Sequence, residues 1–107
     1  MTPFVLTPAA RRDLEEIWDY LAADNRKLAE RVLDKIEAAM RKLARTPAIG
    51  HLREDLADRR HRFFLVYSYL IVYRSDARPL QVIRILHASR DVQSLLGLHE
   101  DQPWPWK

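Results

Sequence analysis

Three short apolar runs in the second half of the chain constrain its fold more than any other feature. Residues 62–67, 69–74 and 80–88 are rich in β-branched and aromatic side chains, and each run has the length of a strand. Short connections separate them, so the runs are predicted to form consecutive antiparallel strands, a meander. The last run is apolar on both faces except at Gln81, Arg84 and His87. This pattern is typical of a central, covered strand.

Simple alternation of side chains predicts which residues share a face of this meander. It places Val82, Arg84 and Leu86 on one face of the last strand. Ile83, Ile85 and His87 then lie on the opposite face. The turn at residues 67–68 contains neither Gly nor Asn, so the sequence leaves its type open.

The first half of the chain predicts a short strand followed by two helices. Residues 4–6 are apolar and lie between prolines, which favours a strand at or near a sheet edge. Thr7 and Pro8 start an amphipathic helix that runs to about Ala23, and Asp13 belongs to its polar face. A second helix follows Asn25 after a short connection and ends before Pro47, so the two helices form an antiparallel hairpin.

Together these elements predict an α+β fold: an N-terminal strand and an antiparallel helical hairpin packed on a small curved sheet with a three-stranded antiparallel meander. We expect the helices to cover one face of the sheet and the other face to stay concave and partly open. The 107 residues suit a single domain, which we assign to residues 1–98, with a Trp- and Pro-rich tail at 99–107.

The composition narrows the classes of function. Cysteine is absent, and no stretch approaches the roughly 20 apolar residues that a membrane span needs. A cytoplasmic protein without membrane contact is therefore expected. The net charge of +3 and the pI near 9.5 favour an acidic partner, either nucleic acid or protein.

The residues that could carry chemistry are few. The four histidines lack the spacing of a metal site, and two glycines are too few for a phosphate-cradling loop, so we expect neither metal nor cofactor. His87 and Ser89 could form a base and a nucleophile, but an ordinary hydrogen-bonded histidine is the favoured interpretation.

Basic and aromatic residues of the meander allow a second hypothesis. They could converge on one side of the sheet and hold RNA by phosphate pairing and base stacking. The favoured alternative is that the tyrosines are half-buried strand residues and that the arginines pair with acidic neighbours. The arginines concerned are Arg60, Arg62, Arg74, Arg84 and Arg90; the acidic neighbours are Asp76, Asp91 and Glu54.

Several segments, in their order along the chain, resemble the toxins of the RelE/ParE superfamily. They are LTPAA at 6–10, DLEEIWDY at 13–20, ARTPAIG at 44–50, YLIVYR at 69–74 and VIRILHASRD at 82–91. The last segment is the most specific, and the resemblance covers residues 3–96. It implies a helical hairpin on a curved sheet and a toxin of a type II toxin–antitoxin module.

The resemblance also implies a partner, a ParD-like antitoxin with an acidic segment that wraps the toxin. An amphipathic helix in an apolar groove and an extended segment at a sheet edge are both compatible with such a partner. We expect no sequence-specific DNA binding by this chain itself. The predicted partner-binding residues are Trp18, Arg62, Tyr73, Arg74, Arg84, Trp104 and Trp106.

The superfamily has two branches with different targets. RelE-like members cut mRNA on the ribosome with basic residues and often a tyrosine near the C-terminus, whereas ParE-like members inhibit DNA gyrase. Here no tyrosine follows Tyr73, and no lysine lies between Lys42 and Lys107. The sequence therefore resembles the gyrase-directed branch, with no catalytic residues. The alternatives are a RelE-type endoribonuclease using Arg84, His87 and Arg90, or a non-toxic binding module.

Overall fold

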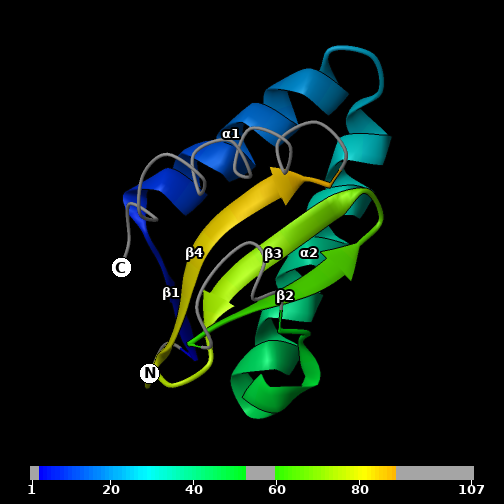
Figure 1. The fold of residues 1–107 in the computed structure, drawn as a ribbon. Coiled ribbons are helices and arrows are strands. Elements are labelled where there is room, and N and C mark those ends of the chain that lie inside the picture. The colour runs from blue at the N-terminus through cyan, green and yellow to red at the C-terminus, as the bar shows by residue number, and fades with distance from the viewer. Residues whose placement is uncertain (1–2, 53–59, 89–107) are drawn as a thin grey trace.

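The computed structural model describes residues 3–52 and 60–88, and it contains two helices and one sheet (Figure 1). The two helices lie on the same face of the sheet, as predicted. The elements in chain order are β1 (Phe4–Leu6), α1 (Pro8–Ala22), α2 (Arg26–Arg45), a 3-10 turn η1 (Pro47–Ile49), β2 (His61–Val66), β3 (Tyr69–Arg74) and β4 (Leu80–His87).

Both helices begin where their capping residues predict. The Thr7 side chain accepts a hydrogen bond from the Ala10 N–H at 3.1 Å, and Pro8 occupies the first helical position. The Asn25 side chain accepts from the Leu28 N–H at 3.0 Å and caps α2 in the same way. Because only three residues separate the helices, α2 folds back along α1 as a hairpin.

The sheet has four strands in the order β1-β4-β3-β2. The pairs β2–β3 and β3–β4 are antiparallel, which confirms the meander, and β1 pairs with β4 in parallel. β1 lies at one edge of the sheet and β4 between two strands, as the prolines and the two-sided apolar pattern predict.

A register shift corrects the predicted faces of β4. Tyr73 pairs with Val82 and Val72 pairs with Arg84, so Ile83 is the extra residue of a β-bulge. After such a residue the alternation of faces moves by one position. Val82 and Ile85, which alternation placed on opposite faces, therefore both belong to the core cluster beneath the helices.

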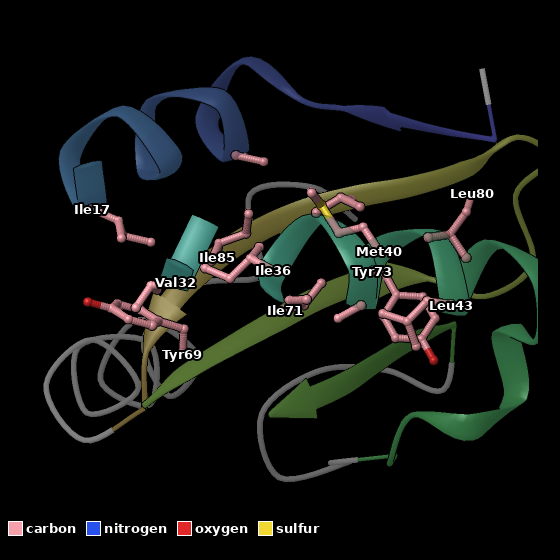
Figure 2. Close-up of a cluster of buried hydrophobic side chains, with 13 residues drawn as sticks. Ile17, Val32, Ile36, Met40, Leu43, Tyr69, Ile71, Tyr73, Leu80 and Ile85 are labelled. Carbon is pink, nitrogen blue, oxygen red and sulfur yellow. The ribbon is translucent and has the colours of Figure 1, made fainter. Parts of the chain in front are cut away.

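That core lies between the hairpin and the sheet (Figure 2). Ile36 and Leu43 of α2 pack towards Ile71 and Tyr73 of β3, and all four side chains are fully buried. Burying an aliphatic side chain of this size contributes about 1.5–3 kcal/mol, so this seam is a main source of the fold's stability.

The opposite face of the sheet, which the sequence predicted to be partly open, is covered at its centre and exposed at Leu65 of β2. Phe63, Val72 and Leu86 are each at most 2% exposed. Phe63 pairs with Val72, next to the core residue Ile71, so these side chains point away from the helices. An exposed concave surface for RNA is therefore not available at these three positions.

Candidate partner-binding surfaces

The seam between α1 and β4 is closed by two side chains from the start of α1. β1 pairs with β4 only as far as Val82, so the backbone groups of β4 beyond it need other partners. The Thr7 hydroxyl donates to the Ile83 carbonyl oxygen at 2.7 Å, and the Asp13 carboxylate accepts from the Ile85 N–H at 2.9 Å. These two backbone groups of β4 are thus bonded by side chains of Thr7 and Asp13 in place of a neighbouring strand.

Arg84, a predicted partner-binding and alternative catalytic residue, belongs to the same seam. Its Nε and Nη2 atoms donate to the two Asp13 carboxylate oxygens at 2.7 and 3.0 Å. The Asp13 side chain is 10% exposed and that of Arg84 is 28% exposed. A two-point, charge-assisted pair of this kind fixes orientation as well as energy. In this structure the guanidinium of Arg84 joins the sheet to α1.

Tyr73, another predicted partner contact, is a core residue. Its side chain is fully buried, and its hydroxyl donates to the Pro47 carbonyl oxygen and accepts from the Gly50 N–H at 2.9 Å. Burial raises the pKa of Tyr73, although the Gly50 N–H and the nearby Arg62 charge act in the opposite direction. Tyr73 offers no surface to a partner in this structure; it ties β3 to the turn after α2.

Arg62 and Arg74 do not converge on one side of the sheet. Arg62 pairs with Tyr73 and directs Nη1 to the Gly50 carbonyl oxygen at 2.9 Å. Arg74 follows Tyr73 on the strand and therefore points to the opposite face, where it makes two hydrogen bonds to Asp76 at 2.9 and 2.8 Å. The pairing with Asp76 is the one that the sequence favoured, and the bond from Arg74 lowers the pKa of Asp76.

Trp18 lies beside a groove between the two helices. Two adjoining apolar depressions share Leu14 of α1 and Leu33 of α2, and Trp18 lines one of them. Acidic residues form its rim: Glu15, Asp19, Asp34 and Glu37. The guanidinium carbon of Arg26 lies 5.9 Å from the centroid of the Trp18 ring, within the range of a cation–π contact. The role of Trp18 in partner binding stays a prediction.

A second groove, between α2 and β2, was not recognised in the sequence. Four residues of α2 line one side of this groove, and the last three residues of β2 and the turn residue after them line the other: Lys35, Ala38, Ala39 and Lys42 against Phe64, Leu65, Val66 and Tyr67. Leu65 and Tyr67 are 57% and 54% exposed, and the two lysines make the rim basic. Two exposed large apolar residues in one groove are a signal of an interaction site, and only their place in the fold reveals it.

His87 lines a third cavity, beneath α1. Its ring packs edge-on against Tyr69, with the centroids 5.7 Å apart. Glu16 and Tyr20 of α1 line the same cavity. This cavity therefore brings a histidine together with other groups able to transfer protons.

The remaining predicted site residues, Arg90, Trp104 and Trp106, lie outside the residues that the structure describes, as does the tail. Among residues 3–52 and 60–88, no group of three potential metal ligands is found, and no helix there is long and apolar enough to cross a membrane.

A helical hairpin on one face of a four-stranded mixed sheet is the architecture of the RelE/ParE superfamily. The family model described as the ParE toxin of the type II toxin–antitoxin system parDE matches residues 4–92. The chain belongs to this ParE toxin family.

Individual relatives agree with this assignment. Toxin ParE1 of Caulobacter vibrioides is 30% identical over 91% of this chain and 100% of its own length. Toxin ParE1 of Mycobacterium tuberculosis is 31% identical over 83% of this chain and 92% of its own. A solved structure, the chromosomal ParDE TA system from P. aeruginosa, has the same fold, with a TM-score of 0.66 and 19% identity over 80% of this chain and 95% of that chain.

Proposed function

We propose that this protein is a cytoplasmic toxin that inhibits DNA gyrase without catalysing a reaction and that a ParD-type antitoxin neutralises it. The observation that carries the proposal is the match of the ParE family model to residues 4–92, which include all the described helices and strands. A structural neighbour supports the antitoxin as partner, because the P. aeruginosa structure is a ParDE system.

The geometry of Arg84 adds support. An RNA-cleaving site needs cations directed at a phosphate and groups that transfer protons to and from the reacting oxygens. Arg84 instead directs two nitrogen atoms at Asp13 inside the protein. A structural role for Arg84 accounts for its place in the VIRILHASRD segment without any catalysis.

Ribosome-dependent mRNA cleavage is the second candidate, because one observation favours it. The cavity beneath α1 brings His87 together with Glu16 and Tyr20, a set that is able to carry acid–base chemistry.

One pair of reactions separates the two functions. The purified protein is added to gyrase with relaxed plasmid, and to ribosomes that translate a defined mRNA. Loss of supercoiling, or accumulation of cleaved plasmid, with intact mRNA is the expected result, and a ParD-type antitoxin should reverse it. Cleaved mRNA with normal supercoiling would refute the gyrase proposal, and His87→Gln would then test the cavity.

A further inference from the structure

Most of the cations of α2 lie along one side of the helix. With 3.6 residues per turn, five exposed basic residues fall within an arc of about 80° around the helix axis: Lys27, Arg31, Lys35, Lys42 and Arg45. The same arc contains one further residue, the small and exposed Ala38. From Lys27 to Arg45 the row is about 27 Å long, since each helical residue rises 1.5 Å. These five residues are called the basic stripe.

The acidic residues of α2 lie outside the basic stripe. Asp34 and Glu37 line the groove between α2 and α1. The ion pairs of the helix lie outside the stripe as well: Arg26 with Glu30, and Arg41 with Glu37. No member of the stripe makes an ion pair with another residue that the structure describes. Surface charge that serves solubility alone is usually mixed in sign, so this separation needs another explanation.

The stability of the helix does not explain the stripe. Lys27, Arg31 and Lys35 follow one another at i, i+4 spacing, where like charges repel. Lys27 lies in the first turn, which contains no acidic residue, and a cation is unfavourable at this positive end of the helix dipole. Lys42 and Arg45 suit the last turn, so the dipole accounts for only these two. The other three cations indicate an anionic partner.

The two helices also differ in net charge. α2 contains seven basic and three acidic residues, a net charge of +4, whereas α1 contains two basic and four acidic residues, a net charge of −2. The charge of α2 therefore accounts for the net charge of +3 of the whole chain. A polyanion is attracted to the outer side of α2 and repelled by α1, which favours one orientation of the bound molecule.

We propose that the basic stripe of α2 binds the phosphate backbone of duplex DNA. The occupant rests on the proposed function, because the DNA on which gyrase acts is double-stranded. A row of about 27 Å spans about eight phosphates of one strand, which are spaced about 3.4 Å apart along the axis of the duplex. Phosphate contacts carry no sequence information, so the expectation that this chain lacks sequence-specific DNA binding is unaffected.

The composition of the stripe favours duplex DNA over other polyanions. The arc contains no aromatic side chain on which the bases of single-stranded RNA could stack. Lys35 and Lys42 line the groove beside β2, where an acidic protein segment could reach them, but Lys27, Arg31 and Arg45 lie outside that groove. A partner with regularly spaced anions pairs with all five cations, whereas a segment held in the groove pairs with two.

The test measures the affinity of the purified toxin for a fluorescent duplex of about 20 base pairs by anisotropy at several salt concentrations. Each phosphate contact contributes about 0.9 to the slope of log K against log salt, so five contacts predict a slope near about −4.5. Arg31→Gln/Lys35→Gln should reduce the magnitude of the slope by about 1.8. It should also weaken Kd about tenfold or more at about 100 mM salt.

The matched control is Arg12→Gln/Arg41→Gln, which removes the same charge from exposed helix positions outside the stripe. It should change the slope by less than about 0.5. Glutamine is a good helix former and all four positions are exposed, so circular dichroism should show the same helix content in both variants. Single-stranded RNA of the same length and polyglutamate, added as competitors, should each displace the duplex at least about tenfold less well than unlabelled duplex.

Three results would overturn the stripe as a DNA site. The first is an equal slope for the wild type and Arg31→Gln/Lys35→Gln. The second is an equal loss of affinity in this variant and in the control, which would mean that only the total charge matters. The third is stronger competition by RNA or by polyglutamate than by the duplex, which would assign the stripe to RNA or to an acidic protein.

The supercoiling reaction separates this inference from the proposed function. Arg31→Gln/Lys35→Gln should need about tenfold more protein than the wild type or the control for half-inhibition of gyrase at about 100 mM salt. Inhibition that is equal in all three proteins, with no binding to the duplex, would overturn the DNA contact and leave the gyrase proposal in place. A wild type that binds the duplex through the stripe but does not inhibit gyrase would refute the proposed function and leave the DNA contact.

Discussion

Replacing Asp13 with alanine should strongly destabilise the protein although the residue lies on the polar face of an amphipathic helix. The carboxylate accepts three hydrogen bonds, two from Arg84 and one from the Ile85 N–H. Its removal leaves the buried Ile85 N–H without a partner, which costs about 1–3 kcal/mol. Loss of the charge-assisted pair adds about 1 kcal/mol, since Arg84 keeps some access to water. We expect Asp13→Ala to lower the free energy of unfolding by about 2–4 kcal/mol.

The partner variant should behave differently. Arg84→Ala leaves the Asp13 carboxylate bonded to the Ile85 N–H, so it should cost less than Asp13→Ala, about 1–3 kcal/mol. The double variant should be less destabilised than the sum of the two by about 1–2 kcal/mol, because the interaction that both remove is counted twice in the sum.

Urea unfolding followed by circular dichroism measures these differences, with Asp19→Ala as the control on an exposed position of the same helix. A loss below about 0.5 kcal/mol for Asp13→Ala, equal to that of Asp19→Ala, would refute the assignment of Asp13 as the link between α1 and β4. If the destabilisation of the double variant equals the sum of those of the two single variants, the coupling between Asp13 and Arg84 is refuted.

Three further variants test the rest of the fold. Tyr73→Phe should cost about 1–3 kcal/mol, because the buried Gly50 N–H loses its acceptor. Burial raises the pKa of Tyr73 above its usual value near 10, so the unfolded chain loses this proton first. Above about pH 10, the free energy of unfolding should therefore fall more steeply with pH for the wild type than for Tyr73→Phe. An equal pH dependence of the two free energies, measured by urea unfolding, would contradict this. Gly50→Ala places a Cβ against the Tyr73 hydroxyl and within 2.8–2.9 Å of two ring atoms. This crowding should lower the free energy of unfolding by about 1–3 kcal/mol. An unchanged urea midpoint would show that the turn can shift to make room. Tyr67→Asn should stabilise the free protein by about 1 kcal/mol, because asparagine tolerates positive φ; a destabilised variant would mean that the ring supports the turn.

The sequence was sufficient to predict the elements because their signals are local. Thr7 with Pro8, and Asn25, mark helix starts within a few residues of the turns that they cap. The two-sided apolar pattern of residues 80–88 placed β4 inside the sheet. The bulge at Ile83 could not be predicted, because the run contains no Gly or Pro and the shift appears only in the pairing with β3.

The candidate site was harder to predict, because its contacts join distant parts of the chain. Asp13 looked like a solvent-facing helix residue, and its partner Arg84 lies 71 positions later. Tyr73 was predicted to be a half-buried strand residue or a partner contact, whereas the turn at 47–50 bonds its hydroxyl in the interior. The groove at Leu65 joins α2 to the end of β2, and no periodicity within either element shows that they meet there.

The pair between Asp13 and Arg84 changes how a loss of toxicity should be interpreted. A toxin whose Arg84 is replaced would lose activity in cells simply because less of it is folded. Asp13 interacts with Arg84 and the β4 backbone in the interior, so Asp13→Ala should reduce toxicity in parallel with its loss of stability if Arg84 is structural. Supercoiling inhibition per folded molecule should then be the same for both variants and the wild type. If Arg84 instead acts on RNA, Arg84→Ala should abolish mRNA cleavage at equal folded concentration while Asp13→Ala retains it. Comparison of the two variants at matched folded concentration therefore separates the structural role of Arg84 from a catalytic one.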